Sequence, residues 1–227
     1  MTLRFVFMLT RHDRTVPDAM VYLKAAQAVG IQDIGFKDIG LPPAQLKDLN
    51  EAIHAGGATS YLEVVSLDRE WEIESAKAAT KIGVDALLGG TRVGDVLPIL
   101  QGTGIRYYPF PGRITGHPSV LEGSIEEIVD SARVLCKFEG VHGLDLLAYR
   151  SREDAPTLMK AVCEAVDKPV IVAGSIDTPE RIGVVQRSGA AAFTIGTAVL
   201  DGKYPATRKD TRGQLSAVLR DIRRLCK

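Results

Sequence analysis

The sequence has no excess of charge of either sign. Among its 227 residues, 28 are Lys or Arg and 28 are Asp or Glu, so the formal net charge at neutral pH is zero. It also has no basic stripe and no run of like charges, the features by which nucleic-acid binding is usually recognised. We therefore expect no nucleic-acid partner.

Cysteine is scarce, and long apolar runs are missing. The three cysteines (Cys136, Cys163 and Cys226) are odd in number and widely spaced, with no Cys-x-x-Cys motif. This pattern is typical of a reducing compartment rather than of a disulfide framework. No long apolar segment follows a basic start, so we expect neither a signal peptide nor a membrane span. Together these features predict a cytoplasmic protein with no membrane partner.

Motifs for metals and nucleotides are also missing. The histidines are His12, His54, His117 and His142. None of them forms a His-x-His or His-x-x-x-His pair, so a metal site is not favoured, although Asp and Glu side chains leave a magnesium ion as an alternative. No Gly-x-Gly-x-x-Gly follows a predicted strand, and no flavin signal is specific. We therefore expect no cofactor.

Short apolar runs alternate with helical patterns along the whole chain. Strands are predicted at 3–9, 33–36, 60–65, 85–88, 105–109 and 144–148, and within 169–177 and 191–198. Helices are predicted at 18–29, 43–55, 70–82, 94–100, 124–138, 155–166, 178–189 and 214–225. Such alternation is typical of a parallel α/β fold. Eight strands predict one (β/α)8 barrel, or TIM barrel, as a single domain over residues 1–227, with an open doubly wound sheet as the alternative.

Small residues follow the last two predicted strands. Gly174 and Ser175 leave the first of them, and Gly196 and Thr197 leave the second. Glycine lets a ligand approach the backbone, and the start of a following helix offers free N–H groups to an anion. We interpret these four residues as a phosphate-binding cradle. The alternative is that the glycines only form tight strand-to-helix corners.

This pair of motifs resembles the last two strands of ribulose-phosphate-binding (β/α)8 barrels, and the isomerase and cyclase barrels of histidine biosynthesis in particular. The segment Leu200-Asp-Gly-Lys-Tyr204 is similar to the Asp-Gly-Lys-Phe tail of that family. The resemblance covers roughly the last quarter of the chain. It implies a barrel that binds a phosphorylated small molecule at strands seven and eight.

A weak internal repeat relates the two halves of the chain. Residues 83–91 (GVDALLGGT) resemble residues 189–197 (GAAAFTIGT). The likeness suggests that Gly90 and Thr91 hold a second anionic group of the substrate. The alternative is that the exit of strand four simply favours small residues.

In a (β/α)8 barrel, the reacting groups come from the C-terminal ends of the strands. Strand one ends in Thr10-Arg-His-Asp-Arg-Thr15, in which His12 and Asp13 are a candidate acid and base and Arg11 is a candidate substrate ligand. A histidine near a carboxylate can titrate near neutral pH, which suits proton transfer next to a carbonyl group. The alternative is a solvated surface loop.

Charged residues also follow strands two and three. Lys37 and Asp38 end strand two, where the lysine is either a cation that steers a phosphate or enolate or an amine that forms an imine. Glu63 lies inside an apolar strand, where a carboxylate is costly to bury alone. We expect it to meet a cation such as Lys37, either as a general base or as a structural ion pair. Lysine and aspartate are adjacent here, unlike the Asp-x-Lys-x-x-Asp spacing of orotidine-phosphate decarboxylases.

The loop after strand five is stiffened by three prolines and two glycines, and we place Arg113 and His117 of this loop over the substrate. Arg150, after strand six, is a candidate clamp for a carboxylate or phosphate. The alternatives are a shaped loop and a contact in a homo-oligomer. Asp85 and Asp145 are assigned to strand starts, at the opposite end of the barrel.

These residues favour an enzyme that acts on a phosphorylated small metabolite. The leading hypothesis is a sugar-phosphate isomerase or epimerase that moves a proton next to a carbonyl group. The candidate catalytic residues are His12, Asp13, Lys37, Asp38 and Glu63. The resemblance implies a second aspartate from strand five or six, and none matches there, which argues against the family's own reaction. The alternatives are a lyase (an aldolase or decarboxylase) that uses Lys37 and a non-catalytic sensor of a phosphometabolite.

Overall fold

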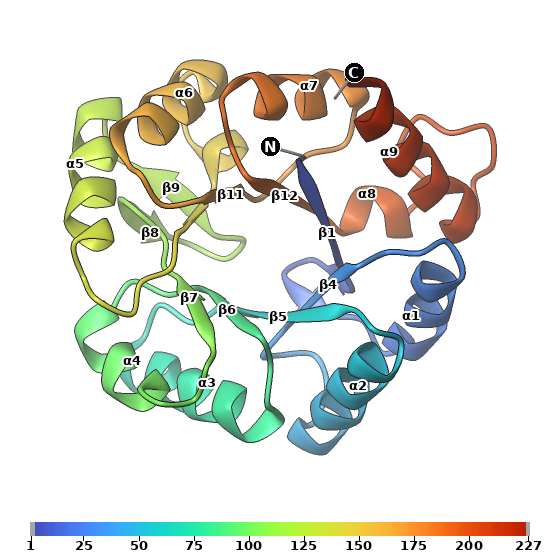
Figure 1. Cartoon of the computed structure of the whole chain (residues 1–227), viewed down its shortest axis with the longest axis horizontal. Coiled ribbons are helices and arrows are strands. Elements are labelled where there is room, and N and C mark those ends of the chain that lie inside the picture. Colours follow the sequence, from blue (N-terminus) through green and yellow to red (C-terminus); the bar gives the residue numbers. More distant parts are fainter. Residues whose placement is uncertain (1–2, 226–227) are drawn as a thin grey trace.

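Eight short apolar segments pair as parallel strands in the computed structural model, which describes residues 3–225. The strands are β1 (Arg4–Met8), β4 (Asp33–Lys37), β5 (Thr59–Val64), β6 (Ala86–Gly89), β7 (Arg106–Tyr108), β10 (Leu144–Leu146), β11 (Val170–Val172) and β12 (Ala192–Ile195). They form the inner ring of Figure 1, and helices surround them. The predicted (β/α)8 fold is confirmed. Cys226 lies outside the described residues.

The helices follow the strands in the predicted order. They are α1 (Ala19–Ala28), α2 (Pro43–Ala55), α3 (Arg69–Ile82), α4 (Val93–Leu100), α5 (Ile125–Cys136), α6 (Ala155–Ala165), α7 (Pro179–Arg187), α8 (Thr197–Leu200) and α9 (Thr211–Leu225). A short 3-10 turn, η1 (Ala148–Arg150), follows β10. None of the helices described between residues 3 and 225 has the length and apolar character needed to cross a membrane.

Local sequence explains where individual helices begin. The Asp68 carboxylate accepts hydrogen bonds from the N–H groups of Glu70 and Trp71 at the start of α3. Ser124 and Glu127 form a reciprocal capping box at the start of α5. Thr178 caps α7, and Pro179 occupies its first position, as predicted.

The sheet runs in the order β10-β11-β12-β1-β4-β5-β6-β7. Its two ends meet at a parallel bridge between Tyr107 and Val141. The Asp145 N–H then donates to the Pro109 carbonyl at 3.1 Å. These contacts bring β10 against β7 and almost close the barrel.

The apolar residues form two layers. The larger layer lies between the sheet and the helices, and a smaller one fills the inside of the barrel. The inner residues are Val6, Met8, Tyr61, Ala86, Leu88, Tyr108, Ile171 and Ala192. At the N-terminal end, Arg4 pairs with Asp33, which also accepts a hydrogen bond from the Tyr61 hydroxyl at 2.9 Å. The polar inward side chains at the C-terminal end of the barrel form the candidate site.

Two short hairpins project from the C-terminal end of the barrel. One consists of β2 (Thr10–Arg11) and β3 (Arg14–Thr15), and the other of β8 (Arg113–Thr115) and β9 (Val120–Glu122). The sequence predicted a polar cluster or solvated loop at the first place and a stiff loop at the second, with no strands at either. These hairpins matter because they position Asp13 and Ser119.

Candidate active site

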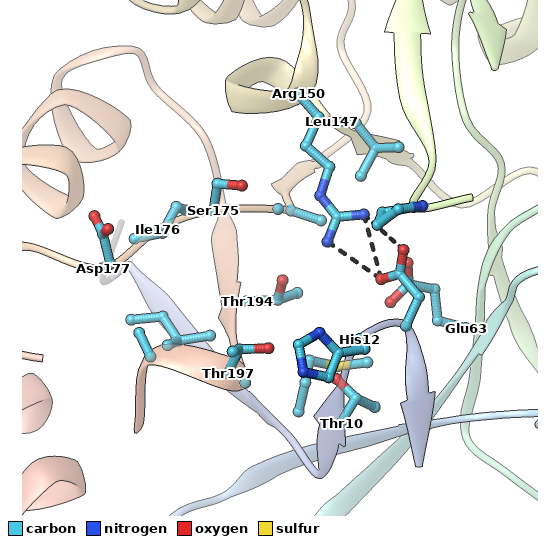
Figure 2. Close-up of a pocket in the computed structure, with 18 of the residues that line it drawn as sticks. Thr10, His12, Glu63, Leu147, Arg150, Ser175, Ile176, Asp177, Thr194 and Thr197 are labelled. Atoms are coloured by element: carbon cyan, nitrogen blue, oxygen red, sulfur yellow. Dashed lines mark hydrogen bonds and ion pairs between the residues drawn. The ribbon is translucent and has the colours of Figure 1, made fainter. Parts of the chain in front are cut away.

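A cavity of about 350 Å³ opens at the C-terminal ends of the strands. Charged side chains line one side of it: Asp13, Lys37, Glu63 and Arg150. Small residues of the segments 173–177 and 194–198 line the other side. Figure 2 shows this division, with Glu63 and Arg150 facing Ser175, Thr194 and Thr197 across the cavity. We call the four charged residues the charged cluster.

The first member of the cluster is placed by the β2–β3 hairpin. Its two turn residues, His12 and Asp13, have φ angles of 51° and 54°. A two-residue turn with both φ values positive is the type I′ geometry, which joins twisted antiparallel strands well. Side chains tolerate this conformation at a cost of order 1–3 kcal/mol, and Asp and His adopt it more often than most residues. The turn buries Asp13 and leaves exposed His12 on the cavity wall.

The Asp13 carboxylate joins three separate elements. It accepts from the Lys37 ammonium at 3.1 Å, from the Arg150 guanidinium at 3.0 Å and from the Ser119 N–H at 3.3 Å. Burial alone would raise its pKa, but Lys37 and Arg150 outweigh burial and hold the pKa well below its usual range. Asp13 therefore stays ionised and holds the other members of the cluster in place. A carboxylate with so low a pKa is poorly suited to the role of base suggested by the sequence.

Lys37 and Glu63 meet as the sequence analysis expected. The Lys37 Nζ atom lies 2.9 Å from Glu63 Oε1, and the two residues are only 4% and 6% exposed. Burial by itself would lower the pKa of Lys37, yet the charges of Glu63 and Asp13 raise it above its ordinary value. Lys37 is thus an ammonium ion at neutral pH, placed beside a carboxylate that faces the cavity.

Asp145 is a buried acid next to the charged cluster, and the sequence did not predict that position. It lies near the start of its strand, as predicted, since β10 begins at Leu144. Its assignment to the far end of the barrel was wrong, because Glu63, Lys37 and Arg150 are close enough to act on its charge. The carboxyl group is fully buried, and neither of its oxygens has a hydrogen-bond partner among residues 3–225. The pattern Leu144-Asp-Leu146, a carboxylate inside an apolar strand, is the signal that also singled out Glu63.

The small-residue side of the cavity has the geometry expected of an anion cradle. Gly174 and Ser175 have φ angles of 83° and 57°, and the N–H groups of Ser175 and Ile176 find no acceptor within the described part of the chain. A side chain at Gly174 would collide with Arg150. At Gly196, a Cβ would lie 2.9 Å from the carbonyl oxygens of Met8 and Thr10. Thr197 then opens α8, where the first N–H groups have no partner within the helix.

The second anion site suggested by the internal repeat is already filled. Glu72, from α3, accepts hydrogen bonds from the Thr91 and Arg92 N–H groups at 2.9 and 2.8 Å. This carboxylate is fully buried, and it lies against Gly90. Because the protein's own anion occupies the turn, Gly90 and Thr91 have no room for a substrate anion.

Other predicted site residues lie away from the cavity. Asp38 follows Lys37 and faces the opposite side of the sheet, where it accepts from the Ser75 hydroxyl on α3. Arg11 pairs with Asp201 at 2.7 Å, and Arg113 pairs with Glu122 at 2.8 Å. His117 is in the turn of the β8–β9 hairpin, of which Pro118 lines the cavity. The structure therefore brings His12, Asp13, Lys37, Glu63 and Arg150 together and leaves Arg11, Asp38 and Arg113 out.

Metal ligation has little support in this geometry. Across residues 3–225, no three His, Cys, Asp or Glu side chains are grouped in a way that could hold a metal ion. One oxygen of Asp13 and one oxygen of Glu63 already accept hydrogen bonds from the Lys37 ammonium. What the site offers instead is a buried cation, a neighbouring carboxylate and a row of free backbone donors.

No family model and no curated protein matches the chain. Among solved structures, a native KDPGal structure is similar over all of this chain and 96% of its own length, with 16% identity and a TM-score of 0.67. Orotidine 5'-phosphate decarboxylase from Pyrococcus horikoshii OT3 is similar over 96% of this chain and 99% of its own, with 15% identity and a TM-score of 0.71. FabK from Thermotoga maritima aligns with 92% of this chain and 61% of its own, at 14% identity and a TM-score of 0.61. At such identities these similarities show that the chain has the TIM-barrel fold.

Proposed function

We propose that the protein is an enzyme that isomerises or epimerises a sugar phosphate by moving a proton next to a carbonyl group. The observation that carries the proposal is the Lys37 ammonium, held beside the Glu63 carboxylate at the wall of a cavity whose other wall is a row of free N–H groups. The cavity has donors for an anion on one side and an acid/base pair on the other. This arrangement matches the two ends of a phosphorylated carbonyl compound.

The phosphate would bind at the small-residue wall. The N–H groups of Ser175 and Ile176 and the start of α8 at Thr197 supply donors without a competing protein acceptor. Such a phosphate contact fixes the orientation of the rest of the molecule. The carbonyl end of a short sugar then reaches the charged cluster on the opposite wall.

The proton transfer would use Glu63 and Lys37. Glu63 removes a proton from the carbon next to the carbonyl, and the electron pair of that C–H bond moves onto the carbonyl oxygen. The Lys37 ammonium stabilises the resulting oxyanion in a site largely withdrawn from water. For isomerisation, the hydroxyl proton on the adjacent carbon passes to the oxyanion by way of the Lys37 amine, and Glu63 returns the carbon-bound proton to the former carbonyl carbon, so that the carbonyl group moves by one position. For epimerisation, the oxyanion collapses back to the original carbonyl, and exposed His12 delivers a proton to the same carbon from the opposite face.

Binding of phosphorylated compounds tests the first half of this proposal. We expect sugar monophosphates to raise the Tm of the wild-type protein in a thermal-shift screen, because a ligand that binds only the folded state stabilises it. Ser175→Asp and Thr197→Asp should lose this shift, since each adds a carboxylate to the phosphate wall. Thr207→Asp, at an exposed position away from the cavity, is the matched control and should keep it. Equal shifts in all four proteins would contradict a phosphate site at this wall.

A lyase remains the second candidate, and one observation favours its non-covalent form. A buried ammonium beside the cavity can stabilise the carbanion formed by decarboxylation as well as an enolate. Orotidine 5'-phosphate decarboxylase, which shares the fold, is named for such a reaction on a phosphorylated compound. Release of carbon dioxide distinguishes a decarboxylase from an isomerase, which instead exchanges a substrate C–H proton with deuterated water.

The imine-forming type of aldolase fits the site poorly. An imine requires a neutral amine, whereas two carboxylates raise the pKa of Lys37 and keep it protonated. We therefore expect borohydride to trap no adduct at Lys37 when it is added with the compounds that bind in the screen. Intact-protein mass spectrometry checks this, and a reduced adduct on the peptide that carries Lys37 would favour the aldolase instead.

A further inference from the structure

Asp145 is a buried acid beside the charged cluster, and neither the proposed reaction nor an ion pair gives it a role. It lies in the same layer of the barrel as Lys37 and Glu63. Strand register places Lys37 beside Glu63, Glu63 beside Leu88 and Leu88 beside Tyr108. Asp145 joins this layer through its N–H bond to Pro109, the residue after Tyr108.

The surroundings of Asp145 contain charged groups but no partner. Glu63 on β5, Lys37 on β4 and Arg150 on η1 are close enough to act on its charge. The other elements packed against it offer the phenol Tyr108 on β7 and the apolar Leu88 on β6 and Ile171 on β11. Neither Asp145 oxygen accepts or donates a hydrogen bond within residues 3–225. An ionised carboxylate in such a place would be very costly.

The balance of charges in the cluster also disfavours an ionised Asp145. Asp13 and Glu63 carry two negative charges, and Lys37 and Arg150 carry two positive charges at contact distances. The charged cluster is therefore neutral without Asp145. An ionised Asp145 would add a third negative charge, with no cation left to compensate it.

We propose that Asp145 is an uncharged acid whose retained proton keeps the cluster neutral and leaves Glu63 ionised as the base. Its part in the reaction rests on the proposed function, whereas its protonation in the resting protein does not. Asp145 is thus a positioning residue that acts through the Lys37–Glu63 ion pair. Burial and the charge of Glu63 raise the pKa of Asp145 well above its usual range, which agrees with this assignment.

The retained proton has a consequence for stability that needs no substrate. Above a pH of about 4, the unfolded chain ionises Asp145 while the folded protein keeps it neutral, so wild-type stability falls as pH rises toward the folded pKa. Asp145→Asn removes this loss. We expect the Tm of the variant relative to wild type to increase by about 3–5 °C per pH unit from pH 5 upward until the folded pKa of Asp145 is reached.

Asp85→Asn is the matched control for this measurement. Asp85 is half-exposed at the other end of the barrel and accepts from the Ser60 N–H at 2.7 Å. Although burial alone would raise its pKa, bonds from Ser60 and His54 lower it, so its contribution is lost as pH falls rather than as it rises. A Tm difference for Asp145→Asn that does not change with pH, or that follows the trend of Asp85→Asn, would overturn the neutral-acid assignment. Asp145→Ser, smaller and also uncharged, serves if the asparagine variant does not fold.

The second arm of the experiment measures turnover against pH with a compound identified by the thermal-shift screen. Wild-type activity should decline on the alkaline side as Asp145 ionises, and Asp145→Asn should lose this decline while keeping the acid limb. If Asp145 had only a structural role, its replacement would not change the dependence of activity on pH. If the activity of wild type and of Asp145→Asn declines in the same way at alkaline pH, the positioning role is refuted, even when the stability measurement gives the expected result. If no phosphorylated compound binds or turns over, the proposed function fails and the stability arm alone decides the protonation of Asp145.

Discussion

Replacing Lys37 with methionine should lower kcat by about 10²–10³-fold. It should also lower the free energy of unfolding by about 3–5 kcal/mol, the usual cost of removing one partner from a buried ion pair. The Lys37 Nζ atom lies 2.9 Å from a Glu63 oxygen and 3.1 Å from an Asp13 oxygen. Methionine occupies a similar volume, so packing changes little. The loss comes from two buried carboxylates that no longer share a cation.

The loss of activity has a separate cause. In the proposed reaction the Lys37 ammonium is the group that faces the developing oxyanion. Removal of one such preorganised donor typically lowers kcat by about 10²–10³-fold. Steady-state kinetics with a compound from the binding screen measures this effect, and urea unfolding followed by circular dichroism measures the stability.

A double variant separates the two effects. In Lys37→Met/Glu63→Gln, the Glu63 carboxylate that lost its cation is replaced by a neutral amide, so most of the lost stability should return while kcat stays at least as low as in the single variant. Lys47→Met is the surface control, because its ammonium is 4.0 Å from Glu51 in an exposed pair and its loss should change stability by less than about 0.5 kcal/mol. Wild-type turnover in Lys37→Met, or equal instability in the single and double variants, would show that the cation is not central to the site.

The succession of strands and helices was predictable because each depends on neighbours in sequence. Apolar runs ending in Gly or Ser marked strands, and local signals such as Thr178-Pro179 marked the start of a helix. The pairing of Glu63 with Lys37 was also predictable, since a carboxylate in an apolar strand requires a nearby cation. Small residues that end strands seven and eight were predicted to form one wall of a binding site, and those residues do line the cavity.

The sequence did not predict which side chains at the C-terminal end of the barrel face its axis. Lys37 and Asp38 are consecutive, so at most one can face the axis, and composition did not show that Asp38 turns toward Ser75. Glu72 fills the turn at Thr91 from 19 positions away, and Arg150 reaches Asp13 from 137 positions away. Contacts of this range follow from closure of the barrel and leave no local pattern. Asp145 was misplaced for a related reason, because the charged groups near it come from β4, β5 and η1.

Replacing Asp13 should have the second largest effect, and two substitutions separate its carboxylate from its backbone. Asp13→Asn keeps the shape of the side chain and tolerates the φ of 54°, while Asp13→Gly relieves that conformation and removes the side chain. If the residue served only the turn, the glycine variant would be as stable as wild type or more so. Because the carboxylate binds Lys37, Arg150 and the Ser119 N–H, we expect both variants to lose about 3–5 kcal/mol in urea unfolding at neutral pH.

The pH dependence of that loss has a defined sign. Lys37 and Arg150 overcome the effect of burial and depress the folded pKa of Asp13, so its stabilisation is present above the unfolded value of about 3.9 and disappears as pH falls below it. The gap in stability between wild type and Asp13→Asn should therefore be constant from pH 5 to 7 and narrow below pH 4. This trend is opposite to that expected for Asp145, whose retained proton makes wild type weaker as pH rises. A gap that stays constant down to pH 2, measured by urea unfolding at each pH, would mean that Asp13 contributes through shape and not through charge. If the stability effects of Asp13 and Asp145 instead change with pH in opposite directions, the contacts of each carboxyl group determine its charge. In the proposed reaction, an anionic Asp13 and an uncharged Asp145 leave Glu63 as the group that moves the proton.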